Sequence, residues 1–114
     1  MDRSVKRDIT RRYRKMEESL GGVADEISCF ECDQCGQVTK VRQIVKGITP
    51  GGIECPYCHG SAGLNIFDAF PNIPVTHEWY RPTLDEVLGM AEDRMFTVDF
   101  ILKGGLLRRK CLTD

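Results

Sequence analysis

Two short cysteine pairs constrain the fold of this chain more than any other feature of its sequence. The pairs, Cys32 with Cys35 and Cys55 with Cys58, each enclose two residues, and 19 residues separate them. Two residues between cysteines allow a tight turn that directs both thiolates at one ion. Two such turns give four sulfurs, the closed tetrahedral set that structural zinc prefers.

The composition favours metal over disulfide bonds for these cysteines. The chain has six cysteines in 114 residues, but its first fifteen residues lack the apolar core of a secretory signal. Thiols stay reduced inside cells, so cysteine pairs in a chain that is not exported are expected to bind metal. We therefore expect a cytoplasmic protein with no membrane partner and no small-molecule substrate.

The cysteine segment resembles the zinc-ribbon family over about residues 29–60. The motifs that carry the resemblance are CDQCG at residues 32–36 and CPYCHG at residues 55–60. A glycine after the second cysteine suits a positive φ; Gly36 fits that position, whereas Gly60 is displaced by one. The resemblance implies one structural Zn²⁺ ion with four ligands: Cys32, Cys35, Cys55 and Cys58.

The segment between the two pairs is expected to form the hairpin that joins them. Residues 49–52 favour a turn, and residues 53–54 lead into the second pair. The residues that favour a strand before this turn are Val38, Val41, Ile44, Val45 and Ile48.

Other proteins use similar cysteine motifs for different chemistry. Rubredoxins bind one iron ion through such turns and transfer electrons, so an iron carrier is the alternative from another functional class. The CxxCH pattern at residues 55–59 matches haem attachment, which needs export, and a thioredoxin-like dithiol needs a βαβ pattern that is not evident. The side chains expected to lie outside the ligand set are Cys29, Cys111, His59 and His77.

Residues 1–22 predict a basic amphipathic helix. Basic side chains occupy most of its circumference, and Gly21-Gly22 ends it. The apolar residues that form a narrow stripe on a helix over residues 3–20 are Val5, Ile9, Tyr13, Met16 and Leu20.

Residues 23–63 are assigned to the zinc ribbon, and residues 64–114 to an irregular linker, a C-terminal helix and a basic tail. Three prolines in residues 61–82 predict an ordered but irregular connection, with one short strand at Leu64–Phe67. The predicted fold class is a small α+β metal-stapled domain. Its zinc-ribbon β-hairpin is flanked by an N-terminal and a C-terminal α-helix, packed as one unit.

The C-terminal helix has a clear start. Thr83 is a good N-cap, and Glu86 three residues later completes a capping box. The apolar spacing continues to about Lys103, before two glycines. Residues 97–102 (TVDFIL) are β-branched and partly alternating, so a strand is the alternative there.

Charge is segregated along the chain, although its total is −1. Residues 1–15 carry seven basic and two acidic side chains, a net +5, while the remainder carries nine basic and fifteen acidic ones, a net −6. A basic arm of this kind meets phosphate or an acidic partner, or it folds back on its own acidic body. Both outcomes stay open at this point.

Nothing in the sequence supplies an active site, so we predict a binding module and not an enzyme. Four thiolates around one zinc ion leave no open coordination position for activating water. No Ser/His/Asp set or phosphate-binding loop accompanies them. The metal is expected to stabilise a hairpin that is too small to have a core of its own.

Two groups of side chains are candidate partner-binding residues. Basic side chains on the N-terminal helix and on one face of the predicted hairpin strand suit phosphate or acidic surfaces. Adjacent Trp, Tyr and Arg are types enriched at interface hot spots, although Trp79 is also expected to pack between the second helix and the ribbon. The candidates are Arg7, Arg11, Arg12, Lys40, Arg42, Lys46, Trp79, Tyr80 and Arg81.

Parts of the C-terminal half resemble small zinc-ribbon proteins of tailed phages and prophages. The similar segments are THEWYRPT at residues 76–83 and LKGGLLRR at residues 102–109. The resemblance implies a regulatory, host-takeover or counter-defence role through binding. Our leading prediction is a non-enzymatic adaptor or regulator that binds a macromolecular partner, foremost a protein complex. Direct binding of DNA or RNA through the basic helix and the hairpin is the alternative, and a rubredoxin-like iron electron carrier is the further one.

Overall fold

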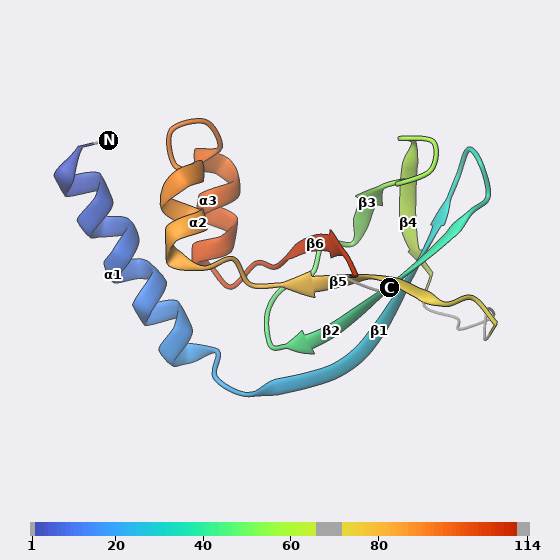
Figure 1. Cartoon of the computed structure of the whole chain (residues 1–114), viewed down its shortest axis with the longest axis horizontal. Helices are drawn as coiled ribbons and strands as arrows, with labels where there is room; N and C mark the ends of the chain where they lie inside the picture. Colours follow the sequence, from blue (N-terminus) through green and yellow to red (C-terminus); the bar gives the residue numbers. More distant parts are fainter. Residues whose placement is uncertain (1, 66–71, 112–114) are drawn as a thin grey trace.

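Three helices gather at one end of a curled six-stranded sheet in the computed structural model, which describes residues 2–65 and 72–111 (Figure 1). The helices are α1 (Arg3–Ser19), α2 (Leu84–Met90) and α3 (Met95–Leu102). The strands are β1 (Val23–Cys32), β2 (Val38–Val45), β3 (Gly52–Glu54), β4 (Ser61–Asn65), β5 (Val75–Tyr80) and β6 (Leu107–Lys110). The molecule is therefore a small, elongated α+β protein, with extents of 48 × 29 × 28 Å. None of these helices is long and apolar enough to cross a membrane.

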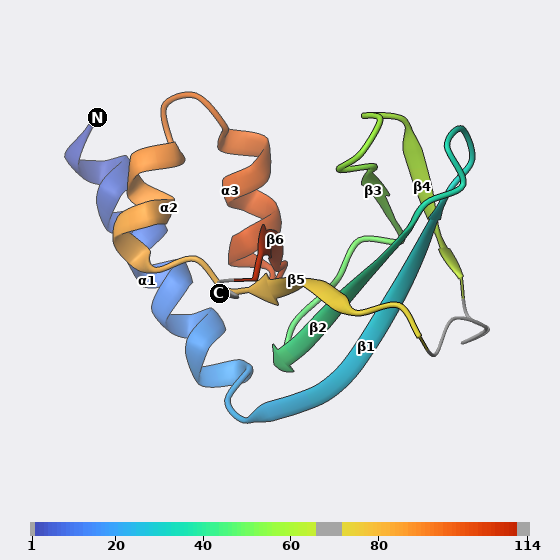
Figure 2. The same cartoon turned by 45° about the vertical axis from the view of Figure 1, so that its right-hand side comes forward.

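Helix α1 follows the predicted stripe closely. Asp2 caps its first turn by accepting a hydrogen bond from the Ser4 amide at 3.0 Å. Ile9, Tyr13 and Met16 are buried on one face. That face packs on α2 and α3, as Figure 2 shows, while the opposite face of α1 points away from the molecule. The predicted helix over residues 3–20 is confirmed.

The C-terminal helical region consists of two helices, so the prediction of one helix to Lys103 is wrong. The capping box of Thr83 and Glu86 is present at the start of α2, as expected. The chain then turns after Met90, whose carbonyl accepts hydrogen bonds from Asp93 and Arg94. A straight helix of this length would extend about 30 Å, beyond the reach of the short apolar stripe on α1. Folding it into α2 and α3 brings both halves against α1.

The helical prediction for residues 97–102 is confirmed within α3, and the strand alternative is wrong. Val98, Ile101 and Leu102 are buried against α1 and α2 at helical spacing. A strand would place neighbouring residues 101 and 102 on opposite faces. Because both are needed in the same apolar layer, the helix buries more of this segment.

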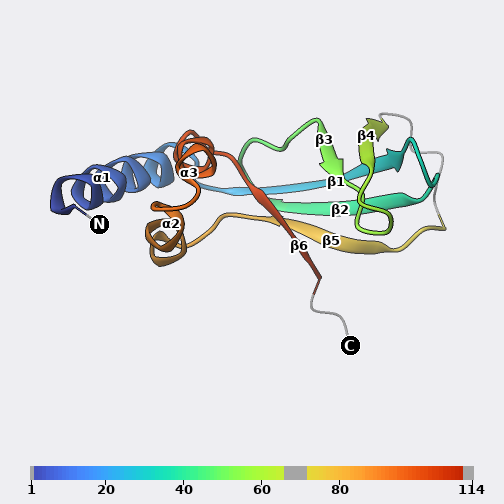
Figure 3. The same ribbon diagram turned by 90° about the horizontal axis from the view of Figure 1, so that it is seen from above.

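The sheet has the strand order β3-β4-β1-β2-β5-β6. Strand β5 runs parallel to β2, whereas the other neighbouring strands are antiparallel. Seen from above, β1, β2 and β5 run side by side away from the helices (Figure 3). The curl of the sheet encloses a second apolar cluster, which is centred on Phe30, Val41 and Trp79.

Strands β5 and β6 correct the predictions for the region after residue 63. The stretch that the prolines marked as irregular contains β5, because Pro74 and Pro82 lie on either side of this strand and do not interrupt it. The predicted basic tail contains β6, which is an edge strand paired with β5. The predicted strand Leu64–Phe67 overlaps β4 at residues 64–65, and its other residues lie outside the described part of the chain.

The predicted hairpin between the cysteine pairs is also wrong. Strand β2 pairs with β1 and β5, while β3 pairs with β4. Strand β2 ends at Val45, and Ile48 makes only an isolated bridge with Gly105. Each cysteine pair therefore lies at the turn of its own hairpin, the first between β1 and β2 and the second between β3 and β4.

Candidate metal centre

Two hairpin turns bring four cysteines together at the end of the sheet far from the helices. Cys32 ends β1 and Cys35 lies in the following turn, while Cys55 follows β3 and Cys58 lies in the turn before β4. Strand β4 pairs with β1 and places the two turns beside each other. The four Sγ atoms all lie within 4.8 Å of one another.

The distances between these sulfurs fit a shared metal ion and not disulfide bonds. Sγ of Cys32 lies 3.4 Å from Sγ of Cys58, and Sγ of Cys35 lies 3.6 Å from Sγ of Cys55. A disulfide would require about 2.05 Å. Four sulfurs at about 2.3 Å from a tetrahedral zinc ion would be roughly 3.8 Å apart, close to the spacing found here. The four cysteines can therefore hold a metal ion.

The backbone of the first turn is shaped around the Cys32 sulfur. The amides of Gln34 and Cys35 point at it, with N···Sγ distances of 3.3 and 3.4 Å. Gly36 has a φ of 74°, a left-handed conformation that glycine adopts without steric cost. These features favour a thiolate at Cys32, because amide donors stabilise negative charge on sulfur.

The second turn has the same geometry with a different residue at the left-handed position. His59 occupies the place equivalent to Gly36 and has a φ of 65°. Gly60 serves a packing purpose instead, since a Cβ there would lie 2.7 Å from Oε1 of Gln34 in the first turn. The displaced glycine of the sequence motif therefore allows the two turns to approach each other.

Hydrogen bonding and crowding shift the pKa values of the two thiols of the first pair in opposite directions. Amide hydrogen bonds from Cys35 and Gln34 lower the pKa of Cys32 to about 6. A hydrogen bond from the Gln37 amide lowers the pKa of Cys35, but desolvation and the other three thiols outweigh it and raise that pKa to about 12. Because a metal ion binds the thiolate form of cysteine, its binding would release the proton of a thiol such as Cys35.

The other candidate ligands lie outside this cluster. Cys29 is buried on β1, and Cys111 is partly buried after β6. His59 points its Nδ1 at Glu54, 3.1 Å from Oε1, and His77 Nδ1 lies 2.7 Å from the Thr76 hydroxyl. In the described part of the chain, the only group of three or more His, Cys, Asp or Glu side chains close enough to share a metal is the four-cysteine set.

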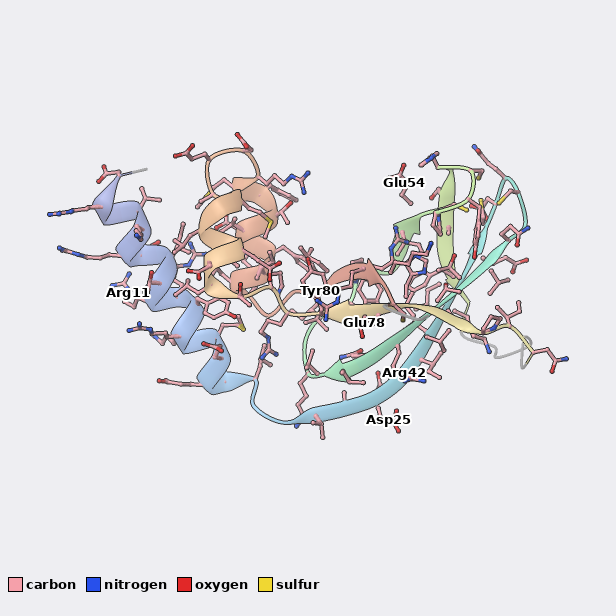
Figure 4. All side chains as sticks on the ribbon, viewed as in Figure 1. Arg11, Asp25, Arg42, Glu54, Glu78 and Tyr80 are labelled. Atoms are coloured by element: carbon pink, nitrogen blue, oxygen red, sulfur yellow. The ribbon has the colours of Figure 1, made fainter. Side chains whose placement is uncertain are left out.

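The predicted basic residues of α1 divide into two groups. Arg12 turns toward the molecule and pairs with Asp99 of α3 at 3.2 Å. Arg7 and Arg11 are exposed, and Figure 4 shows Arg11 extending away from α2 and α3. We use the term α1 basic face for the exposed cations of this helix: Arg3, Lys6, Arg7, Arg11, Arg14 and Lys15.

The predicted basic face between the cysteine pairs is not continuous. Lys40 is only 7% exposed, whereas Arg42 on the same strand is exposed (Figure 4). Lys46 is exposed but lies beyond the end of β2. The pairing of β2 with β5 is irregular between Lys40 and Val41, and Lys40 is buried, so the exposed basic side chains of this segment are Arg42 and Lys46.

Trp79 and Arg81 are engaged within the molecule, and Tyr80 is partly covered. Trp79 is 2% exposed and packs edge to face on Phe30, with ring centroids 5.9 Å apart. The Arg109 guanidinium lies over the Tyr80 ring at 4.4 Å. The Arg81 guanidinium donates to the backbone carbonyl of Lys46, and a longer contact of 3.5 Å reaches that of Leu20. Arg81 therefore joins the sheet to the end of α1.

One set of exposed side chains was missed by sequence reasoning. Phe96 is 91% exposed at the start of α3, next to Arg94. Phe96 and Arg94, together with Arg108 of β6, line a groove between the helices and the sheet. No sequence signal indicated this groove, because its walls come from segments whose relative position depends on the unpredicted strand β6.

Comparisons with known proteins give this chain no relatives. No protein-family model matches it, and neither a curated protein nor a solved structure shows significant similarity.

Proposed function

We propose that this chain is a non-enzymatic zinc-ribbon adaptor that binds an acidic surface of a partner protein through the α1 basic face. The observation that carries the proposal is the separation of two features. A cluster of four cysteines lies at one end of the sheet, and exposed cations lie on the outer side of α1. Figure 1 shows that α1 is at the other end of the molecule.

Zinc suits this donor set. Cys32 and Cys35 of one hairpin turn and Cys55 and Cys58 of the other would hold the ion. Bound zinc would supply a structural cross-link, with four thiolates filling all tetrahedral positions. The cysteines would thereby keep two short hairpins together, and the free energy of metal binding would become free energy of folding.

The α1 basic face supports the choice of partner. Of its members, Arg11 makes a salt bridge with Asp8 at 2.7 Å, yet its side chain remains 77% exposed. Within residues 2–65 and 72–111, Arg7 and Arg14 make no salt bridge. Exposed cations of this density favour an acidic partner and accelerate its association.

The metal assignment is tested by elemental analysis of the purified full-length chain. We expect about one zinc per chain and a colourless solution. A red sample with one iron per chain and thiolate-to-iron absorption would contradict zinc and support the electron-carrier alternative.

The partner assignment is tested by capture from the native cell, with and without nuclease. We expect the same protein to be captured in both cases, and its recovery to fall at least tenfold for the variant Arg7→Glu/Arg11→Glu. Lys110→Glu is the control, because it reverses an exposed charge on the sheet and leaves α1 unchanged. Recovery that is insensitive to the α1 variant would contradict the proposal.

Direct nucleic-acid binding is the second candidate, and it is favoured by the same row of exposed cations. Its signature is a steep loss of affinity with salt, because each neutralised phosphate releases counterions. If nuclease abolishes capture and DNA or RNA affinity falls steeply between about 50 and 200 mM salt, nucleic acid replaces protein as the partner.

A further inference from the structure

A groove separates the helical layer from the sheet on the side away from α1. Its volume is about 640 Å³, within the range of ligand-binding pockets. One wall is α3, with Phe96, Thr97 and Phe100, and the other includes Ile53 of β3 and Arg108 of β6. In Figure 4, Tyr80 lies at the end of β5 nearest the helices, and Glu54 lies further from the helices, at the end of β3.

The floor of the groove contains a hydrogen-bond donor without an acceptor. Trp79 lines the groove and is 2% exposed, and its indole Nε1 is buried with no hydrogen-bond partner. A buried N–H without a partner costs about 1–3 kcal/mol, so such groups are rare in native proteins. An oxygen atom supplied by a bound molecule would satisfy it once the side chains that cover Nε1 move aside.

Positive charge surrounds the same place. Arg94 and Arg108 both line the groove. Arg94 is also the N-cap residue of α3, and no side chain caps the first amides of this helix. Uncapped amides at a helix N-terminus attract negative charge. The Arg108 guanidinium also donates a hydrogen bond to the Glu54 backbone carbonyl at 3.0 Å, which fixes its position in the groove wall.

Apolar surface accompanies these donors. Phe96 is 91% exposed, and it lines the groove together with Phe100. The Phe100 ring is seated on Gly105, where a Cβ would come within 2.4 Å of it. The combination of exposed aromatic rings and arginines is typical of surfaces that bind protein segments.

From these features we infer that the groove binds a short acidic peptide segment of a partner protein. One carboxylate of this segment lies between Arg94 and Arg108, and an apolar side chain packs on Phe96. A backbone carbonyl or carboxylate oxygen of this segment accepts the hydrogen bond from Trp79 Nε1. The inference rests on the proposed function in one respect, namely that the partner is a protein. The only carboxylate in the groove lining, Glu54, lies 3.1 Å from His59 Nδ1 and also interacts electrostatically with Arg108, whereas Arg94 is exposed at the other wall.

The single tryptophan of the chain makes the inference directly measurable. The probe is the acetylated and amidated peptide Glu-Leu-Phe-Glu, added to the ¹⁵N-labelled, metal-loaded full chain. We expect a downfield shift of the Trp79 indole N–H signal and shifts at the Phe96 and Thr97 amides. The control peptide Lys-Leu-Phe-Lys, in which both charges are reversed, should leave these signals unchanged.

Two variants test the assigned donors. Arg94→Glu reverses an exposed charge and should weaken binding of the acidic peptide at least tenfold. Trp79→Phe keeps an aromatic ring against Phe30 but removes the indole N–H, so binding should weaken about tenfold while the fold is retained. Arg14→Glu, on α1 and outside the groove, is the matched control and should bind the peptide normally.

Specific results would overturn the inference. Equal binding of the acidic and basic peptides, or unchanged binding by Arg94→Glu, would remove the charge argument. Shifts of the groove signals by oligothymidylate and not by the peptide would assign the groove to nucleic acid. A positive peptide result together with failed α1-dependent capture would refute the proposed function alone, because Arg14→Glu separates the two surfaces.

Discussion

The helical end and the cysteine end of this molecule differ in the residues that pack against their buried apolar side chains. At the helical end, Ile9 of α1 packs with Val87 of α2 and Ile101 of α3, all fully buried. At the other end, the cluster inside the curled sheet includes Cys32 and Cys55, two of the four cysteines of the metal centre. The second cluster therefore includes one cysteine of each pair, whereas Cys35 and Cys58, the other two, are exposed.

We infer that apolar packing stabilises the helical end and metal binding stabilises the cysteine end. Apolar packing between three helices is expected to stabilise the helical layer, because each helix contributes buried apolar side chains. Strand β3 has only three residues and one neighbour, β4, which is too little for an independent hairpin. Metal binding is expected to supply the missing stabilisation there, and the following predictions test this division.

The largest effect is expected from removing a buried metal ligand. Cys55→Ser eliminates one of the four thiolates, and zinc binding is worth about 10–16 kcal/mol in small zinc domains. That exceeds the total stability of many domains, about 5–15 kcal/mol, so the sheet should lose its ordered cysteine end. The measurement is metal content together with the near-ultraviolet signal of Trp79.

The control for this variant is Cys111→Ser, which changes a cysteine outside the cluster. It should retain one metal ion per chain and the native Trp79 signal. If Cys55→Ser also keeps one metal ion per chain, the ligand assignment is wrong. Metal binding would then not be what stabilises the cysteine end.

A smaller effect is expected from a cavity in the helical layer. Ile101→Ala should lower the free energy of unfolding by about 2–5 kcal/mol, because Ile101 is fully buried among the three helices. The metal content should not change. Phe96→Ala on the same helix is the control, with an expected effect within about 0.5 kcal/mol. Release of metal by Ile101→Ala would show that the two ends fold as one cooperative unit.

The sequence predicted the parts of this fold that depend on local signals. The stripe of α1 and the capping box of Thr83 and Glu86 involve residues within one or two helical turns of each other. The cysteine cluster was also predictable, because each pair needs only a tight turn and sulfur chemistry selects the partner pair.

The sheet topology was not predictable in the same way. Strand β5 pairs in parallel with β2, more than thirty residues away, and no short-range pattern encodes such a pairing. The burial of Lys40 and Trp79 depends on those long-range neighbours, as does the groove lined by Arg108 of β6. The partner-binding predictions were therefore the weakest, since exposure follows from tertiary structure.

Electrostatic contacts should contribute less to the helical layer than apolar packing does. The Arg12–Asp99 pair joins α1 to α3 at 3.2 Å, but both side chains are more than a third exposed to solvent. A double-mutant cycle with Arg12→Ala and Asp99→Ala should give a coupling of about 0.2–1 kcal/mol that shrinks with added salt. A coupling comparable to the loss in Ile101→Ala would reverse the ranking of forces at this end.

The smallest effect concerns proton binding at the sheet. Burial, Arg108 and Lys110 lower the pKa of His77 from its ordinary 6.5, so the folded protein binds this proton less readily than the unfolded chain. Stability should therefore decrease as the pH falls below about 6.5. An NMR titration should give a His77 midpoint below 6.5, and Lys110→Gln should raise it, while Lys103→Gln leaves it unchanged.

Because Arg108 also lines the groove, a bound acidic peptide should move the midpoint back toward 6.5. A midpoint at or above 6.5 in the free protein would mean that these cations do not act on His77, and that the charge on this side of the sheet is screened from the groove.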